Sequence, residues 1–194
     1  MLGSVTESAA TSPFEYPAPR RRLVTPGLLS TFSYWVESGR FAAGEHPGYA
    51  GAHRLEPRLR ALVGAGIDSF LDLTEEGESD HYVPLFDAAG SDIKLVHRRH
   101  AIPDMGVPSV ETMIGILDTL DESLRTHRAT YLHCLAGAGR TGLVVGCHLV
   151  RHGMNGGMAI QKIGRLRAVL GPNGLESPIT DAQREFVLEW VPGR

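Results

Sequence analysis

Residues 133–142, HCLAGAGRTG, limit what this chain can fold into more than any other short stretch. Three glycines stand within residues 137–142, and glycine weakens the interior of both helices and strands. Residues this small also cannot fill a hydrophobic core. The stretch is therefore expected to be a loop whose exposed backbone groups have a functional role.

Apolar runs on both sides show which elements this loop connects. Residues 129–134 (ATYLHC) are typical of a buried strand, and a helix is expected from near Arg140 to Gly153. A glycine-rich turn from a strand into a helix points successive N–H groups into one concavity, and the positive end of the helix dipole reinforces it. The loop therefore predicts a binding site for a tetrahedral oxyanion.

The rest of the chain repeats the alternation of strands and helices. A β-hairpin is expected in residues 32–48, and Ser109 is a good N-cap for the next long helix. Further strands are expected at 67–73 and 93–99, and helices at 50–66, 82–88, 110–127, 157–170 and 180–191. This order predicts an α/β fold with a mostly parallel central sheet and helices on both faces.

The length of 194 residues suits one domain and a tail. Residues 1–28 are rich in Ser, Thr, Pro and Ala and are expected to form a flexible N-terminal arm, which leaves residues 29–194 as a single catalytic domain. Only two of the 19 basic residues are lysine, a bias that indicates a GC-rich bacterial genome. The oligomeric state stays open.

Charge and cysteine content exclude several classes of function. A net charge of −3 argues against nucleic acid as a partner, and no apolar run approaches the ~20 residues of a membrane span. The first residues contain no stretch typical of a secretory signal. With only two cysteines, neither a disulfide framework nor a zinc site is expected, so we expect a cytoplasmic protein without metal or other cofactor.

The two ends of the loop carry reactive side chains. Cys134 opens the loop, and the surrounding N–H groups together with a guanidinium stabilise its thiolate form. Arg140, six residues later, can hold two oxygens of a phosphate in a bidentate fork. A thiolate beneath a phosphate cradle predicts nucleophilic attack on phosphorus. An ATP-binding loop would instead place Lys-Ser/Thr after its last glycine.

The stretch resembles the signature of the cysteine-dependent protein tyrosine and dual-specificity phosphatases, His-Cys-x5-Arg-Ser/Thr-Gly. The resemblance implies a protein tyrosine phosphatase-like fold, with Cys134 as nucleophile and Arg140 as phosphate ligand. It implies phosphate binding by the residues between them, Leu135, Ala136, Gly137, Ala138 and Gly139.

The same resemblance assigns roles outside the loop. Asp104, 30 residues before the cysteine on the Pro-bounded loop 101–109, is expected to be the general acid. Thr141 is expected to donate to the cysteine sulfur, and His133 to order the loop through a backbone hydrogen bond. Gln183 corresponds to a glutamine that positions the hydrolytic water in some members, but it also fits a capping box with Thr180.

The implied function is hydrolysis of phosphotyrosine, and of phosphoserine or phosphothreonine, in a phosphorylated protein or peptide, through a phosphocysteine. A phosphoinositide or RNA 5′-phosphatase using the same loop is the alternative, although Leu135 and Ala138 stand where lipid phosphatases often carry lysine. A non-catalytic phosphate-binding module, an arsenate reductase and a sulfur-transfer enzyme are weaker rivals. The first of these predicts loss of Cys, Arg or Asp, and all three are present.

Three further features each allow a structural and a functional interpretation. Cys147 could form a disulfide with Cys134, but its apolar helix favours a buried side chain. Residues 74–82 (TEEGESDHY) follow a strand end, so this acidic loop is expected to border the site and to disfavour highly anionic substrates. Residues 97–100 (HRRH) could add positive potential or could be ordinary strand-end charges.

Overall fold

A single sheet with the strand order β1-β2-β5-β3-β4 forms the centre of the protein. The computed structural model describes residues 33–49, 51–89, 94–171 and 176–194, so the arm expected at 1–28 lies outside the described residues. The strands are β1 (Ser33–Glu37), β2 (Phe41–Gly44), β3 (Ser69–Asp72), β4 (Val96–Arg99) and β5 (Thr130–His133). Only the β1–β2 pair is antiparallel, which confirms both the hairpin and the mostly parallel sheet.

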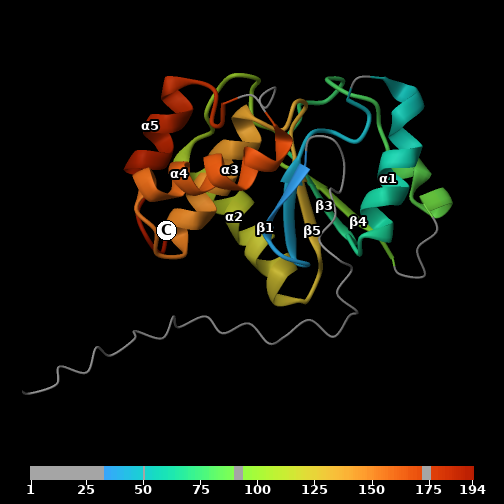
Figure 1. Ribbon diagram of the computed structural model, residues 1–194, viewed down its shortest axis with the longest axis horizontal. Coiled ribbons are helices and arrows are strands. Elements are labelled where there is room, and N and C mark those ends of the chain that lie inside the picture. The colour runs from blue at the N-terminus through green and yellow to red at the C-terminus, as the bar shows by residue number, and fades with distance from the viewer. Residues whose placement is uncertain (1–32, 50, 90–93, 172–175) are drawn as a thin grey trace, which may run out of the picture.

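Helices cover both faces of this sheet (Figure 1), as the alternation of elements predicts. One face packs against α1 (Leu55–Gly64) and the other against α2 (Val110–Arg125), α3 (Gly139–Arg151) and α4 (Gly156–Arg167), while α5 (Asp181–Glu189) packs on α3 and α4. Each face has its own apolar cluster. Phe70 and Tyr131 belong to the cluster under α1, whereas Leu71 and Leu132 belong to the larger cluster under α2 and α3. Adjacent strand residues therefore point to opposite faces.

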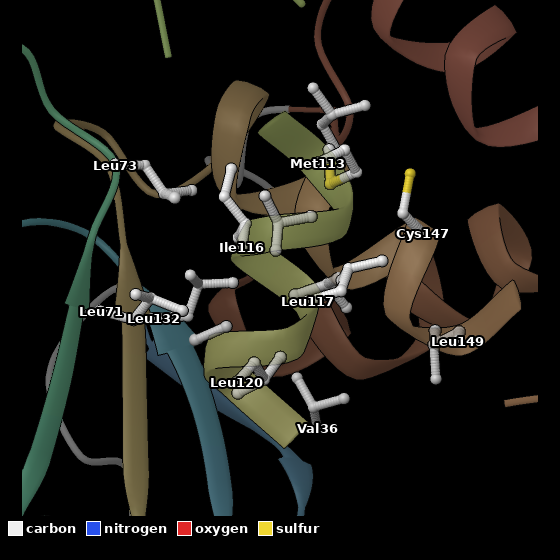
Figure 2. Packing of buried hydrophobic residues seen from close by; sticks show 14 of the residues in the cluster. Val36, Leu71, Leu73, Met113, Ile116, Leu117, Leu120, Leu132, Cys147 and Leu149 are labelled. Carbon is white, nitrogen blue, oxygen red and sulfur yellow. The ribbon is translucent and has the colours of Figure 1, made fainter. Parts of the chain in front are cut away.

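The helices α2 and α3 lie side by side, and both pack directly against the sheet. Its buried residues Ile116, Leu117 and Leu120 belong to the same cluster as strand residue Leu132 and Cys147 of α3 (Figure 2). Cys147 is fully buried, and burial raises the pKa of its thiol. This environment favours the interpretation of Cys147 as a small apolar core residue.

One helix end and one helix type differ from the expectations. Helix α5 ends at Glu189, not at residue 191, because Pro192 disfavours helical backbone just before it. The helix expected at 82–88 is wrong in kind: the chain forms two 3-10 turns, Val83–Leu85 and Asp87–Ala89. A segment this short gains too few α-helical hydrogen bonds to offset nucleation.

The register of the parallel strands places their carboxyl ends at one edge. His133 at the end of β5 lies opposite both Gly44 of β2 and Asp72 of β3. Loops that leave this edge are where open α/β sheets bind ligands, and Cys134 follows the central strand there. No helix in the described ranges is both long enough and apolar enough to cross a membrane.

Candidate active site

The loop between β5 and α3 has the strand–turn–helix context that its glycines predict. Gly137 has a positive φ of 71°, and a side chain there would collide with the backbone of Gly44 and Glu45. At Gly142, in the first turn of α3, a side chain would collide with the hydroxyl of Ser177. Glycine is therefore required at 137 for both backbone conformation and space, and at 142 for space.

Three carbonyls along this loop are bonded to groups outside the loop. The Leu135 carbonyl accepts from the backbone N–H of His46 at 2.9 Å. Arg167 of α4 donates to the Gly137 carbonyl at 2.6 Å, and the Ser177 hydroxyl donates to that of Ala138 at 2.7 Å. Among the described residues no acceptor is recorded for the N–H groups of residues 135–139. The loop amides are therefore available to an oxyanion.

Cys134 is buried at the start of the loop, next to the first turn of α3. The hydroxyl oxygen of Thr141 accepts from the Cys134 backbone N–H at 2.9 Å, and this hydroxyl donates to the Gly44 carbonyl at 3.4 Å. The sequence led us to expect a contact from Thr141 to the sulfur. In this structure the hydroxyl instead holds the cysteine backbone against β2.

His133 lies behind the cysteine and is completely buried. Its Nδ1 is 3.1 Å from the Cys134 carbonyl, and its Nε2 is 2.7 Å from the Tyr82 hydroxyl. A carbonyl can only accept, so Nδ1 carries the proton and Nε2 accepts from the tyrosine. Burial lowers the pKa of His133, which keeps the ring neutral. The expected backbone hydrogen bond is therefore present.

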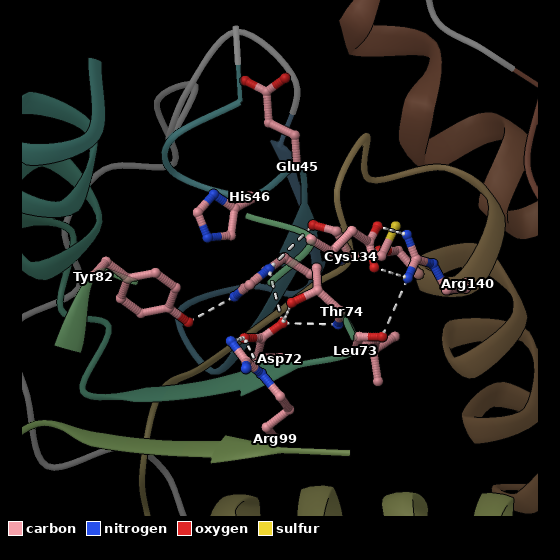
Figure 3. A network of polar contacts seen from close by, with 12 residues as sticks. Glu45, His46, Asp72, Leu73, Thr74, Tyr82, Arg99, Cys134 and Arg140 are labelled. Atoms are coloured by element: carbon pink, nitrogen blue, oxygen red, sulfur yellow. Dashed lines mark hydrogen bonds and ion pairs between the residues drawn. The ribbon is translucent and has the colours of Figure 1, made fainter. Parts of the chain in front are cut away.

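Asp72 anchors the polar network below the loop (Figure 3). One carboxylate oxygen accepts from the Thr74 N–H and hydroxyl at 2.8 and 2.7 Å, and the other accepts from Arg99 and His97. Burial opposes the charge, but these hydrogen bonds and nearby positive groups outweigh it and hold the pKa of Asp72 well below its usual range. Two residues of the 97–100 segment, His97 and Arg99, thus stabilise the negative charge of this buried carboxylate.

Arg140 is almost fully buried, and its guanidinium lies beside the cysteine (Figure 3). Its Nη1 donates to the Glu78 carboxylate at 2.7 Å and to the Ile102 carbonyl at 3.2 Å. Its Nη2 donates to the second oxygen of Glu78 and lies 2.9 Å from Asp104 Oδ1. Two acidic side chains from different loops therefore converge on the expected phosphate ligand.

Asp104 lies on the exposed loop between β4 and α2, and 62% of its side chain is accessible to solvent. Its backbone N–H donates to Glu75 at 3.2 Å, and the next residue, Met105, has a positive φ of 59°. The carboxylate thus faces the guanidinium from the solvent side. That is where a leaving group would depart from phosphate bound by Arg140.

Gln183 is buried at the start of α5 and forms the capping box with Thr180. Its side-chain oxygen accepts from the N–H groups of Ile179 and Thr180, and its Nε2 donates to the Gly106 carbonyl at 3.0 Å. The amide therefore connects α5 to the loop that carries Asp104. Both of its ends are used by the backbone.

The sequence did not single out three residues that shape this site: Glu78, Asp72 and Arg167. For Glu78 the signal was the acidic loop after a strand, which the sequence placed at the border of the site without choosing a residue. Asp72 ends a buried strand, and a charge there is unusual without partners. Arg167 gave no signal, because its contact with Gly137 spans 30 residues and two helices.

Metal-ligating side chains gather elsewhere. In the described ranges, one group of three such residues was found, Asp121, His148 and His152, at the opposite end of α3 from Arg140. The loop with Cys134 has no such group within the residues that the structure describes. Cys134, the amide-lined loop and the Asp104 carboxylate lie around Arg140 at the other end of this helix.

A cysteine after the central strand, an amide-lined loop and an arginine opening the next helix define the protein tyrosine phosphatase class of α/β folds. Residues 46–154 match a family described as a DSP-PTPase phosphatase of polymorphic toxin systems, and the chain belongs to this family. That segment contains Cys134, Arg140 and Asp104.

Individual relatives agree with this membership. Cyclin-dependent kinase inhibitor 3 of Sus scrofa is 31% identical over 90 residues, and the human protein is 30% identical over the same length. The match covers 46% of this chain and 42% of each relative, so the chain spans less than half the length of the curated relatives it matches.

Solved structures share the fold over most of the chain. The active form of Tk-PTP has a TM-score of 0.65 and 25% identity, covering 81% of this chain and 95% of that one. A structure of PTPMT1 in complex with PI(5)P has a TM-score of 0.63 at 18% identity, covering 82% and 94%, which shows the shared fold alone. The phosphatase-like fold implied by the signature is confirmed.

Proposed function

We propose that this chain is a cysteine-dependent phosphatase that hydrolyses phosphotyrosine, and phosphoserine or phosphothreonine, in protein substrates. The observation that carries the proposal is the 2.9 Å contact between Arg140 Nη2 and Asp104 Oδ1. It brings a carboxylic acid from one loop to the guanidinium that closes the Cys134 loop. Nucleophile, phosphate ligand and proton donor thereby meet at one place.

In the first step, the Cys134 thiolate attacks phosphorus and forms the S–P bond while the P–O bond to the substrate breaks. The leaving oxygen takes the proton of Asp104, because an alkoxide or phenoxide is a poor leaving group. Arg140 and the free amides of residues 135–139 hold the three other oxygens as their negative charge redistributes. Family membership and the unpaired loop amides support this assignment.

In the second step, Asp104, now a carboxylate, takes a proton from water as that water attacks phosphorus. The S–P bond breaks, inorganic phosphate leaves and the thiolate is restored. We assign Gln183 a positioning role in this step, because its amide holds the Gly106 carbonyl two residues from Asp104. Thr141 and His133 keep the Cys134 backbone in place from opposite sides.

Glu78 imposes a condition on this mechanism. Its carboxylate uses both Nη1 and Nη2 of Arg140, one of the nitrogen pairs through which a guanidinium can hold phosphate in a bidentate fork. The hydrogen bond from Arg140 lowers the pKa of Glu78 below its ordinary value, so the carboxylate stays charged at neutral pH. A phosphoryl group that binds through Nη1 and Nη2 would displace Glu78, whereas one that binds through Nε and Nη2 would compete with Glu78 at Nη2 alone.

The decisive experiment measures release of inorganic phosphate from a phosphotyrosine peptide, a phosphoserine peptide and a phosphoinositide, each with and without EDTA. We expect turnover of the phosphotyrosine peptide that EDTA leaves unchanged. Cys134→Ser should abolish turnover while retaining binding of phosphate or vanadate. A Cys134→Ser protein that keeps most of its activity would exclude the mechanism. Preferential turnover of the phosphoinositide would exclude the protein substrate and favour the lipid alternative.

We further propose that the chain works in the reducing cytoplasm of a bacterial cell. The support is chemical: the mechanism requires a free thiol at Cys134, and reducing compartments keep such thiols from oxidising. Both cysteines are free and buried in this structure. The partner implied by the site is a phosphorylated protein or peptide.

A further inference from the structure

The far end of α3 carries a cluster that the phosphatase mechanism does not use. His148 and His152 are four residues apart, so they lie on one face of the helix, and Asp121 of α2 faces both. Asp121 Oδ1 is 3.6 Å from His148 Nδ1 and 3.0 Å from His152 Nε2. The three potential ligand atoms all lie within 4.8 Å of one another.

These separations suit a tetrahedral metal ion. Zinc binds imidazole nitrogen and carboxylate oxygen at about 2.0–2.2 Å, which places neighbouring ligand atoms of a tetrahedron about 3.4 Å apart. The two measured separations lie on either side of that value. Two imidazoles and one carboxylate also match the ligand preference of zinc.

His148 is oriented as a metal ligand would be. Its Nε2 is 3.4 Å from the Glu37 carboxylate, which can only accept, so Nε2 carries a proton. Its Nδ1 is buried and has no hydrogen-bond partner among the described residues. Metal-binding histidines commonly donate their second ring nitrogen to a carboxylate in this way. Nδ1 faces Asp121 Oδ1 at 3.6 Å, so a metal ion bound between them would take the place of a proton.

The surroundings provide access and a favourable charge balance. A surface pocket of about 390 Å³ lies beside the cluster and is lined by Asp118, Asp121, Arg151 and His152 among others. Arg151 donates to the second oxygen of Asp121 at 3.0 Å and so leaves Oδ1 for a ligand. With Asp121 itself, the neighbouring carboxylates of Asp118 and Glu37 give three negative charges against the guanidinium groups of Arg151 and Arg40.

We propose that Asp121, His148 and His152 form a binding site for a divalent transition metal ion, with Zn²⁺ as the best match, and that water from the pocket completes its coordination. The site is independent of the phosphatase chemistry, since it lies roughly 12–18 Å along the helix axis from Arg140. It joins α2, which begins after the Asp104 loop, to α3, which begins at the phosphate loop.

Calorimetric titration with Zn²⁺, together with metal analysis after dialysis, tests the proposal. Both use the full chain as Cys134→Ser, because the reactive thiol could itself bind zinc. We expect one Zn²⁺ per chain. His152→Gln and Asp121→Asn should each weaken binding by at least about 100-fold, and Co²⁺ should give the visible absorption bands of a tetrahedral site. His152 lies at the surface, so its variant should fold.

The matched control is His53→Gln, which removes a surface histidine from the 3-10 turn that precedes α1. Its zinc affinity should equal that of the parent. Zinc at 100 times its Kd should also raise the Tm of the parent by about 5–10 °C and leave that of His152→Gln unchanged. Absence of bound zinc, or binding that survives both His152→Gln and Asp121→Asn, would overturn the proposal and leave the cluster as an ion-paired network.

Discussion

The carboxylate of Glu78 binds both terminal nitrogens of Arg140, the side chain expected to hold the substrate phosphate. A negative group thus occupies Nη1 and Nη2, one of the nitrogen pairs that a more highly charged ligand could use. Glu78 extends from the loop after β3, whereas Arg140 belongs to the helix after β5, so the contact crosses between the two central parallel strands. This relationship makes the affinity of the site for phosphate depend on a residue outside the signature loop.

Glu78→Gln should therefore tighten binding of inorganic phosphate. The substitution keeps a hydrogen-bond acceptor for Arg140 but removes the negative charge that opposes a phosphate dianion. We expect the inhibition constant of phosphate to fall about tenfold, measured against turnover of p-nitrophenyl phosphate. A higher inhibition constant would mean that Glu78 serves mainly to align the guanidinium. Glu76→Gln, two residues earlier on the same exposed loop, is the matched control.

Asp104→Asn should lower kcat because the amide cannot protonate the leaving oxygen. The expected loss is about 10²–10⁴-fold for a phosphoserine peptide and smaller for p-nitrophenyl phosphate, whose leaving group is more stable as an anion. The alkaline limb of the pH–rate profile should flatten as well. Asp181→Asn removes a carboxylate that is 97% exposed on α5 and should leave kcat unchanged. Equal losses for both substrates would assign the proton donor elsewhere.

Gly137→Ala should destabilise the fold as well as the loop. The new methyl group would collide with the backbone of β2's last residue, and the positive φ disfavours any L side chain. We expect a loss of about 2–5 kcal/mol in the free energy of unfolding, measured by urea denaturation. Gly164→Ala, at an exposed position in α4 with open space around it, should instead be neutral or stabilising by up to about 1 kcal/mol.

Stability should fall as the pH falls from about 6.5 toward 3, in part through His46. Burial lowers the pKa of His46 to about 3, whereas the unfolded chain binds its proton near pH 6.5. Between these values the unfolded state holds the extra proton, so acid favours unfolding, by at most about 1.4 kcal/mol per pH unit.

Replacing His46 with Gln should make this pH dependence less steep, measured by urea denaturation at pH 7, 5.5 and 4. Some slope should remain, because burial also lowers the pKa of His133. His53→Gln, at a surface position, should follow the parent protein. An unchanged slope in His46→Gln would show that His46 is not buried as a neutral ring in solution.

Local sequence patterns predicted the order of elements, since each depends on near neighbours. The glycines around Arg140 predicted a turn into a helix. Ser109, the expected N-cap, does cap α2 by accepting from the Thr112 N–H. Local patterns could not decide between the two interpretations of Gln183, a helix-capping residue or a residue that positions the hydrolytic water. Its capping box is a contact over three residues, but its bond to Gly106 spans 77.

Long-range pairing explains what the sequence left open. Nothing near Glu78 distinguishes it from Glu75 or Glu76, and only the folded loop shows which of the three reaches Arg140. Arg167, at the end of α4, donates to the Gly137 carbonyl 30 residues earlier in the chain. No periodic sequence pattern predicts this contact. Such contacts depend on how the helices pack, and local sequence patterns do not predict that packing.

The carbonyls of Leu135, Gly137 and Ala138 are held by the segment after β2, by α4 and by the residues before α5, which are spread over some 130 positions of the chain. The inward-facing amides thus exist as a set only after distant parts of the polypeptide have come together. In a partly folded molecule Cys134 would lack the ordered amides around it. We therefore expect catalytic activity to appear only when folding is complete.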